Sequence, residues 1–393
     1  MERITILHTN DLHSHFENWP RIRRYLKTTR QQVMADGATV YTFDLGDHVD
    51  RVHPVSEATN GQQNIQLMNQ IGYDGVTIGN NEGLGFVRAQ LDHLYDHANF
   101  PVILGNLRTP DTHELPDWAI DHRLLTTAAG TRLLVLGLTA PYHLTYPLAG
   151  WQILDVQPTL AALLQRYAGQ FDVCVLLSHL GLDVDRLLAK RFPQVTVIIG
   201  SHTHHLLPHG EHDHQSLLAA AGKFGRYIGK IELSITPDHQ VKSAVASVTE
   251  TATLPVADGD TAEITGLQDL GESILSEQRV ANLPTAMEAD PTGQPRLVRE
   301  GLHAIAEYAG TQAAILNAGL FLQDLPSGVV NQNQLHQLLP HNMHVMTVTL
   351  SGYDLWRLVQ EFELARLFLR RFPQKGMGFR GKIFGELNYL GLA

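Results

Sequence analysis

The chain has 393 residues, of which 44% are hydrophobic and 18% are charged, and its formal net charge is −11 at pH 7. This length favours two domains, because one hydrophobic core seldom holds so many residues, and the composition is that of a globular protein rather than a disordered one. The acidic balance argues against a basic groove for duplex nucleic acid, although a bound metal can give an acidic protein a phosphate site.

The first part of the chain, about 250 residues, alternates short β-branched runs with helical patterns, which is typical of an α/β domain. Strands are predicted at 3–8, 38–44, 75–78, 102–104, 131–138, 173–178 and 195–200, with helices at 21–34, 62–71 and 159–167. Strands at 216–221, 228–235 and 244–249 then follow without helices between them. We therefore expect antiparallel strands added to a mixed sheet.

The periodicity lapses at 254–260, and the polar residues that follow separate two patterned regions. We place a first domain at 1–253 and a second, smaller α/β domain at 261–393, with helices at 264–279 and 298–308 and a strand at 313–317. No segment reaches the roughly 18 apolar residues of a membrane helix, and the chain opens directly on a strand pattern without a signal peptide. A cytoplasmic protein without membrane attachment is the simplest expectation.

Polar residues gather just after several predicted strands, at the edge where open α/β sheets bind ligands. Five strand ends carry Asp, Asn or His, often beside Gly, and supply seven candidate ligands: Asp11, His13, Asp47, Asn80, His179, His202 and His204. A single Asp-x-His or His-x-His pair occurs by chance in many chains. Five such elements in order, each at a strand end, indicate a metal site.

The ligand types narrow the choice of metal, because carboxylate, imidazole and amide oxygen without thiolate suit Mn, Zn, Fe, Co or Ni. Alternate residues of an extended chain point to the same side, so Asp11 and His13 can aim at one site. Two metal ions about 3.5–4 Å apart need a bridging carboxylate, for which Asp47 is the natural candidate. Two divalent ions carry four positive charges, of which Asp11 and Asp47 neutralise two. The two charges that remain suit a phosphate dianion and can acidify a bridging water.

The remaining histidines and the cysteine receive simpler interpretations. His8 precedes the first turn, and we expect it to position that loop rather than to bind metal. His48 and His53 lie in the second loop, where an ordinary surface position is the alternative to a role in the site. Beyond His204, the His-rich stretch up to residue 214 is predicted to be a solvated hairpin, and Cys174 is predicted to be a small core residue.

These ordered motifs resemble those of the calcineurin-like metallophosphoesterases. The opening His8-Thr9-Asn10-Asp11 is similar to the 5′-nucleotidase branch, whose members also hydrolyse UDP-sugars or 2′,3′-cyclic nucleotides. Residues 221–229 resemble the strand segment that follows His-x-His in that branch. Residues 317–319 and 324–328 resemble the start of its C-terminal nucleotide-binding domain, so the likeness covers nearly the whole chain.

The resemblance implies an α/β fold, with a four-layer αββα sandwich followed by a smaller, shortened α/β C-terminal domain. It implies two divalent metal ions, one bound by Asp11, His13 and His204, the other by Asn80, His179 and His202, with Asp47 bridging them. It also implies that Asn317 and Gly319 contribute to substrate binding.

Three features depart from the pattern of that branch. Its Gly-Asn-His-Glu motif reads Gly-Asn-Asn-Glu here, with Asn81 in place of a His that would steady the transition state and protonate the leaving group, and with Leu84 in place of that histidine's Asp partner. Leu322 stands where an Arg that touches the substrate is expected. The chain also ends at Ala393, before the Gly-Gly-Asp-Gly-aromatic segment that helps to hold the base.

Loss of a general acid typically costs about 10²–10⁴ in rate and penalises poor leaving groups most. The candidate catalytic residues are therefore Asn81, at the replaced position, and His48, as an alternative acid. We predict hydrolysis of small phosphoesters, nucleotides or their derivatives, by a metal-activated water. The alternatives are a pyrophosphatase or phosphodiesterase of the same fold, acting on UDP-sugars or cyclic nucleotides, and a weakly active nucleotide-binding protein.

Overall fold

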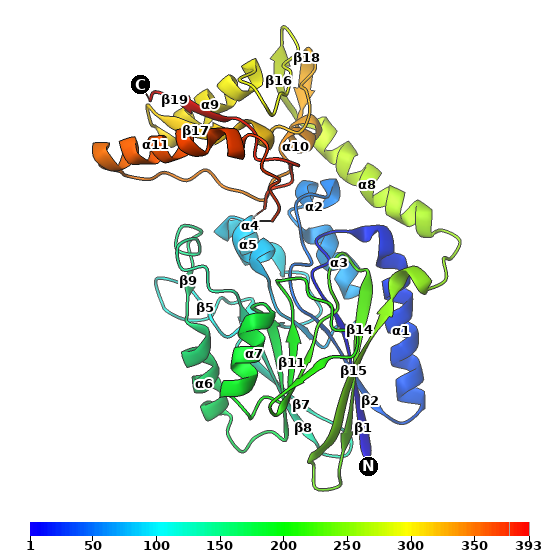
Figure 1. Ribbon diagram of the computed structural model, residues 1–393. Coiled ribbons are helices and arrows are strands. Elements are labelled where there is room, and N and C mark those ends of the chain that lie inside the picture. Colours follow the sequence, from blue (N-terminus) through cyan, green and yellow to red (C-terminus); the bar gives the residue numbers. More distant parts are fainter. Residues whose placement is uncertain (377, 393) are drawn as a thin grey trace. The chain divides into compact units, whose positions relative to one another are not determined.

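The computed structural model describes residues 1–376 and 378–392, which form two compact units that divide between Gln268 and Asp269 (Figure 1). Each unit has its own hydrophobic core. Among the described helices, none is both long and apolar enough to cross a membrane.

A seven-stranded sheet forms one half of the first unit. Its strand order is β15 (Val241–Glu250), β14 (Tyr227–Ile235), β1 (Glu2–Thr9), β2 (Thr39–Asp44), β3 (Gly75–Val76), β4 (Val102–Ile103) and β6 (Ala119–Ile120). From β1 to β6 the strands run parallel, whereas β14 pairs antiparallel with both β1 and β15. This confirms the predicted addition of antiparallel strands for 228–235 and 244–249, whereas the strand predicted at 216–221 lies in the other sheet and pairs parallel with the strand at Val197–Gly200.

A second, six-stranded sheet has the order β12 (Glu211–Asp213), β13 (Ser216–Ala219), β11 (Val197–Gly200), β10 (Val173–His179), β8 (Arg132–Thr139) and β7 (His122–Thr126). Its central strands β8, β10, β11 and β13 are parallel. A short two-stranded pairing of β5 (Leu107–Arg108) with β9 (Gln152–Ile153) lies outside both sheets.

Alternation of side chains along the strands builds the layers. In β10, Val173, Val175 and Leu177 enter the core between the two sheets. Cys174 and Leu176 instead face the helices α6 (Val156–Arg166) and α7 (Leu182–Arg191) on the outer side. The other sheet is covered by α1 (Trp19–Ala35), α3 (Gln62–Asn69) and α5 (Arg88–Leu94). The first unit is therefore the four-layer αββα sandwich that the resemblance implied.

Two short helices lie near the carboxyl edge of the first sheet, α2 (Pro54–Ala58) and α4 (Asn80–Gly85). The last helix of the unit, α8 (Asp260–Glu277), begins in the first unit and ends in the second. Its first half is held by Arg24, which forms two hydrogen bonds of 2.5 and 2.7 Å with Asp260, and by Leu267, which is buried in the core beneath α1. These contacts hold the first half of α8 to the first unit, and the predicted domain boundary at 254–260 lies just before this helix.

The second unit is smaller. It contains two antiparallel pairs, β16 (Arg279–Leu283) with β18 (Gly328–Asn331) and β17 (Ala314–Asn317) with β19 (Leu387–Leu390). Its helices are α9 (Arg296–Ala309), α10 (Gln332–Leu338) and α11 (Gly352–Leu369). The apolar face of α9 packs on β17 and contributes Val298 and Leu302 to the core of this unit.

Candidate metal centre

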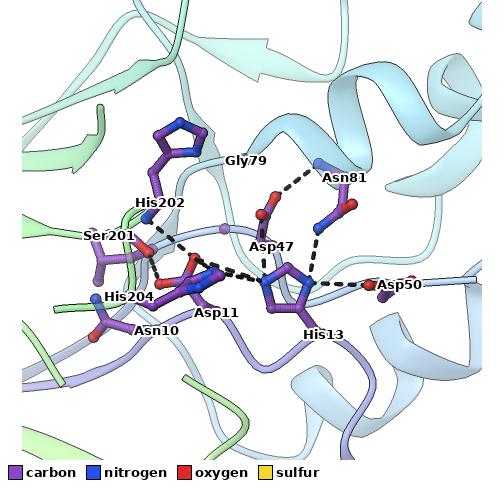
Figure 2. A network of polar contacts seen from close by, with 12 residues as sticks. Asn10, Asp11, His13, Asp47, Asp50, Gly79, Asn81, Ser201, His202 and His204 are labelled. Carbon is purple, nitrogen blue, oxygen red and sulfur yellow. Dashed lines mark hydrogen bonds and ion pairs between the residues drawn. The ribbon is translucent and has the colours of Figure 1, made fainter. Parts of the chain in front are cut away.

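The seven candidate ligands all belong to the first unit and stand at or just after the carboxyl ends of its parallel strands. Those after β1 and β2 lie beside each other because these strands are parallel neighbours, and the same holds for β10 and β11 in the other sheet. The loops are tied together by backbone hydrogen bonds, including His13 N to Asp47 O at 2.8 Å and Asp11 N to Gly46 O at 3.3 Å. Figure 2 shows Asp11, His13, Asp47, His202 and His204 of this cluster with some of their neighbours.

One group of potential ligands consists of Asp11, His13 and His204. The Nε2 atoms of His13 and His204 face each other at 3.2 Å, and Asp11 Oδ1 lies 4.0 Å from the first and 3.6 Å from the second. Asp11 is fully buried and its other oxygen accepts a hydrogen bond from Ser201 Oγ. Two imidazole nitrogens and a carboxylate oxygen thus converge on one point.

A second group consists of Asp11, Asp47 and His179. Asp47 Oδ2 lies 3.6 Å from His13 Nε2 and 3.4 Å from His179 Nε2, so this carboxylate reaches both sides of the cluster. His179 is fully buried, and its Nδ1 is 2.7 Å from the carbonyl oxygen of Leu45. Its Nε2 has no hydrogen bond within the described chain.

Asn80 and His202 belong to neither of these two groups of potential ligands. Asn80 begins α4, and its Oδ1 is a buried atom without a hydrogen-bond partner among the described residues. The backbone N–H of His202 donates to Asp11 Oδ1 at 3.1 Å, while its ring centroid lies 5.2 Å from that of His179. In Figure 2 this ring points away from Asp11, and its Nε2 lies 3.2 Å from the hydroxyl of Tyr142.

The backbone at the cluster is strained. Five of the seven candidate ligands have positive φ angles: Asp11 (44°), His13 (50°), Asp47 (50°), His202 (75°) and His204 (58°). L-residues adopt this region at a cost, and such strain gathers at functional sites. The surrounding structure therefore holds these side chains in positions that an ordinary turn would not give.

Glycine allows the loops to approach closely. A Cβ atom on Gly79 would lie 2.0 Å from Asp47 Oδ1 and 2.4 Å from His179 Cε1. A Cβ on Gly46 would lie 2.3 Å from the backbone nitrogen of Gly79. The carboxylate of Glu82 closes this corner, because it accepts hydrogen bonds from the backbone nitrogens of Asp47 and Gly79, both at 2.9 Å.

The charges of the cluster are strongly perturbed. Burial lowers the pKa of a histidine, but Asp47 and Asp11 outweigh it at His179 and raise its pKa to about 10. Burial and His13 lower the pKa of His204 to about 3. Burial raises the pKa of Asp47, yet His179 and His13 hold it well below its usual range. Without metal, the carboxylates thus attract protons to His13 and His179, which a cation would displace.

The two candidate catalytic residues occupy different surroundings. Asn81 touches the cluster: its backbone N–H donates to Asp47 Oδ1 at 2.8 Å, and its Nδ2 lies 2.8 Å from His13 Nδ1. His48 is 1% exposed, packs edge-on against Trp19, and has no hydrogen bond on either ring nitrogen among the described residues. Burial and His13 lower its pKa to about 3. This environment favours a neutral packing role for His48, and its acid role stays a prediction.

Other histidines have clear local roles. His8 is buried, and its Nδ1 lies 2.8 Å from Asn10 Oδ1, while Asn10 Nδ2 donates to the carbonyl of Gly200 at 2.6 Å. His8 thereby connects the end of β1 to the end of β11. The ring of His53 caps α2 by accepting from Val55 N at 3.2 Å. In the described chain, the histidines after His204 join no cluster of potential metal ligands.

Asn317 and Gly319, predicted to bind substrate, form a packed turn in the second unit. Asn317 Nδ2 donates to the carbonyl oxygen of Phe384 at 2.5 Å, and Gly319 N donates to the same oxygen at 3.1 Å. A Cβ on Gly319 would lie 2.1 Å from the carbonyl oxygen of Ile383. The turn therefore has a structural role, and substrate binding by these two residues stays a prediction.

Residues that the sequence interpretation did not single out also contact the cluster. Asp50 Oδ2 lies 3.1 Å from His13 Nδ1, Ser201 donates to Asp11, and Tyr142 meets His202. Tyr142 follows β8, at whose end no metal-binding motif was predicted. Asp50 lies only three positions after Asp47, but no motif marks it.

Comparison with known proteins assigns the family. Residues 4–206 match the calcineurin-like phosphoesterase model, and residues 284–380 match the model of the 5′-nucleotidase C-terminal domain. The chain is 36% identical over 395 residues to the metallophosphoesterase YunD of Bacillus subtilis (strain 168), covering 100% of this chain and 84% of YunD.

Two more distant proteins agree with this assignment. The trifunctional nucleotide phosphoesterase protein YfkN of the same bacterium is 21% identical over 91% of this chain, which spans only 27% of YfkN. The structure of a 5′-nucleotidase precursor from Thermus thermophilus has the same fold, with a TM-score of 0.61 at 21% identity, covering 86% of this chain and 74% of that one. The chain belongs to the calcineurin-like phosphoesterases and carries a 5′-nucleotidase C-terminal domain.

Proposed function

We propose that this protein hydrolyses phosphoesters of small nucleotide-like molecules with two divalent metal ions bound at the candidate metal centre. The observation that carries the proposal is the convergence of Asp11, Asp47 and His179, and of Asp11, His13 and His204, with their ligand atoms within 4.8 Å of one another in each group. Buried carboxylates and imidazoles in such a group need a cation, or protons, to offset their charge.

The residues fit a pair of metal ions. Buried polar atoms without a hydrogen bond are rare, yet both His179 Nε2 and Asn80 Oδ1 are such atoms among the described residues. Both are lone-pair donors of the type that divalent transition metals bind. We assign Asp11, His13 and His204 to the first ion and Asn80, His179 and His202 to the second, with Asp47 bridging.

When bound, the ions supply positive charge that attracts the phosphate and acidifies water. The residues of the chain hold that charge in place: two buried carboxylates, Asp11 and Asp47, offset two of four positive charges, and the neutral His202 and His204 offset none. The net charge that remains matches a phosphate dianion. Ser201 fixes the carboxylate of Asp11 by a hydrogen bond, and Glu82 fixes the loop of Asp47 by accepting from its backbone nitrogen.

Proton delivery to the leaving group is the weak step of this site. Asn81 contacts both Asp47 and His13, but an amide cannot release a proton at neutral pH. Its side chain can still donate hydrogen bonds to a phosphate oxygen. We therefore propose that substrates with acidic leaving groups, such as anhydrides and activated aryl esters, react much faster than AMP.

The choice of a nucleotide-like substrate rests on the second unit and on relatives. Residues 284–380 match a 5′-nucleotidase C-terminal domain, and the relatives named above include a nucleotide phosphoesterase and a 5′-nucleotidase precursor. The substitution at Asn81 favours one alternative, a pyrophosphatase or phosphodiesterase that acts on UDP-sugars or cyclic nucleotides. It also keeps open a weakly active nucleotide-binding protein.

The test is a metal-supplemented substrate panel. Purified protein is stripped with a chelator, its metal content is measured, and Mn²⁺ or Zn²⁺ is added back before assay with an aryl phosphate, AMP, UDP-glucose and a 2′,3′-cyclic nucleotide. We expect close to two ions per chain, loss of hydrolysis on stripping, and rates that rise steeply with the acidity of the leaving group.

The outcomes separate the three functions. Turnover of UDP-glucose well above that of the aryl phosphate as well as of AMP would select the pyrophosphatase, and preference for the cyclic nucleotide would select the phosphodiesterase. Tight nucleotide binding without turnover of any substrate would leave only the binding protein. Full activity after complete metal removal would refute the proposed metal centre.

A further inference from the structure

Asp50 places a third buried carboxylate beside the candidate metal centre. It is 2% exposed, and its Oδ2 lies 3.1 Å from Nδ1 of His13 (Figure 2). The residue follows the proposed bridging ligand, Asp47, by three positions, but it contacts the far side of the His13 ring. It belongs to neither of the ligand groups described above.

The two nitrogens of His13 face different partners. Nε2 points into the cluster, 3.2 Å from His204 Nε2 and 3.6 Å from Asp47 Oδ2. Nδ1 points the other way, toward Asp50 and the side chain of Asn81. His13 thus stands between a carboxylate on one side and the ligand atoms on the other.

This arrangement fixes how the ring presents its lone pair. An ionised carboxylate can only accept a hydrogen bond, so Asp50 requires the hydrogen of neutral His13 to be on Nδ1, and the amide of Asn81 then turns its oxygen, in place of Nδ2, toward this nitrogen. The lone pair of the ring is then on Nε2, the atom that faces the cluster. Carboxylates that orient metal-binding histidines in this way also raise their basicity.

Asp50 is itself held by a buried polar network. Its backbone N–H donates to Ser14 Oγ at 2.8 Å, and its Oδ1 accepts from Val52 N at 3.0 Å. Ser14 Oγ also receives a hydrogen bond from Asn64 Nδ2 and shares one with the hydroxyl of Ser56, both at 2.9 Å. Ser14, Ser56 and Asn64 are at most 2% exposed. A carboxylate fixed in this way can set the orientation of a neighbouring ring.

We propose that Asp50 is a positioning residue, which orients His13 Nε2 toward the first metal ion and strengthens the binding of that ion. The inference rests on the proposed function only in requiring that a metal ion binds at Asp11, His13 and His204. It adds a third carboxylate to the electrostatics of the centre, and predicts that the two ions depend on Asp50 to different degrees.

The test compares Asp50→Ala and Asp50→Asn with the wild-type chain and with Asp121→Asn. Asp121 is a matched control, because its Oδ1 lies 2.7 Å from Nδ1 of His122, a histidine outside both ligand groups. Metal-free protein is titrated with Mn²⁺ by calorimetry, and its unfolding temperature is measured with chelator and with Mn²⁺.

We expect Asp50→Ala to weaken one of two binding steps by about 10–100-fold, the usual effect of removing a partner of a metal-binding histidine. Asp50→Asn, which keeps a hydrogen-bond acceptor, is expected to fall between Ala and wild type, and Asp121→Asn to match wild type. The unfolding temperature with chelator is expected to fall in Asp50→Ala, because Val52 N and His13 lose a buried partner, and the rise on adding Mn²⁺ should shrink as well, which a purely structural role would not produce.

Unchanged affinity in Asp50→Ala would overturn the inference, as would an equal loss at both binding steps, which would indicate a structural role. If wild type binds two ions but hydrolyses nothing in the substrate panel, the proposed function fails while the inference about Asp50 stands or falls on the affinities alone. If wild type binds no metal, both are overturned.

Discussion

Asp47 contacts residues of both proposed metal sites, since its Oδ2 lies 3.6 Å from His13 Nε2 and 3.4 Å from His179 Nε2. Asp47→Asn keeps the shape but removes the negative charge that both ions would share. We expect metal content to fall below one ion per chain and hydrolysis to drop by about two decades or more, because charge at such a bridge is worth several kcal/mol. Metal analysis and assay of the aryl ester measure both effects.

The control for Asp47→Asn is Asp96→Asn, which neutralises an exposed carboxylate paired with His93. This variant should keep wild-type metal content and rate. Near wild-type behaviour of Asp47→Asn would refute the assignment of two bridged ions.

Gly79 offers a way to disturb the site without changing a ligand. In Gly79→Ala the new methyl group would meet Asp47 Oδ1 at 2.0 Å and His179 Cε1 at 2.4 Å, so both of these candidate ligands must shift. We expect weaker metal binding by at least about tenfold and a loss of stability of about 1–3 kcal/mol, as for other overpacked sites. Calorimetric metal titration and urea unfolding measure the two effects.

Gly266→Ala is the matched control, because a Cβ at Gly266 in α8 would meet nothing within 4 Å. Alanine is the better helix former, so this variant should be as stable as wild type or slightly more stable. Equal metal affinity in Gly79→Ala and Gly266→Ala would show that the close approach at Gly79 does not shape the site.

At the scale of elements, the strands that the sequence predicts best are those buried on both faces. Apolar runs such as Val173–His179 predict strands directly. The candidate ligands can then be predicted too, because they stand at or immediately after the ends of such runs. The sequence pattern does not predict β7 (His122–Thr126), because this strand lies at the edge of its sheet and has few buried side chains. It does not predict α4 (Asn80–Gly85) either, because this helix is short and contains two glycines, which weaken a helical pattern.

The features of the site that could not be predicted from the sequence depend on contacts between segments that are distant along the chain. Asp50 contacts His13 only because the loops after β1 and β2 lie side by side at the edge of the sheet. Tyr142 contacts His202 from a strand end without a motif. Spacing along the chain predicts which residues leave the strands on the same edge. It does not predict which neighbouring side chain turns toward a given ligand.

Asp185, a buried carboxylate of α7, binds β10 next to His179 and lies against the end of β11, which precedes His202. Asp185 is 1% exposed, and its Oδ1 accepts a hydrogen bond from Ser178 Oγ at 2.5 Å. A Cβ on Gly200 would lie 2.3 Å from its Oδ2, so glycine at the end of β11 makes room for this carboxyl. Burial raises the pKa of Asp185 to about 7.

A raised pKa means that the folded protein binds this proton more tightly than the unfolded chain. The stabilising contribution is complete below the unfolded pKa of about 4 and is lost as pH rises through about 7. We expect the unfolding free energy of chelated wild type to fall with a slope of up to about 1.4 kcal/mol per pH unit from this group alone. Asp185→Asn should remove that slope in urea unfolding at pH 5, 6 and 7.

Asp172→Asn is the comparison for this pH dependence. Arg132 lowers the pKa of Asp172, so that carboxyl is ionised in both states between pH 5 and 7 and adds no slope. Identical pH dependence in wild type and Asp185→Asn would show that Asp185 stays ionised in the folded protein.

On the scale of the whole molecule, the two units differ in the number of candidate ligands and hydrophobic clusters that they contain. All seven candidate ligands lie between residues 11 and 204, within a unit that contains three hydrophobic clusters of its own. The second unit has one such cluster. In it, the Asn317–Gly319 turn is occupied by hydrogen bonds to the carbonyl of Phe384, and Leu322 is 40% exposed where the branch places an Arg.

We therefore expect recognition to depend mainly on phosphate and metal, with weak selection among bases. An Arg offers phosphate a bidentate grip that Leu cannot, and its loss should weaken binding by roughly 1.5–3 kcal/mol, about one to two decades in affinity.

The measurement is the kinetics of AMP, GMP, CMP and UMP with the full chain and with a fragment of residues 1–277, which ends with α8. The expected result is a high KM, rates within about tenfold of one another for the four bases, and two metal ions retained by the fragment. A preference for one base above about a hundredfold in the full chain, lost in the fragment, would show that the second unit holds a specific base pocket despite Leu322.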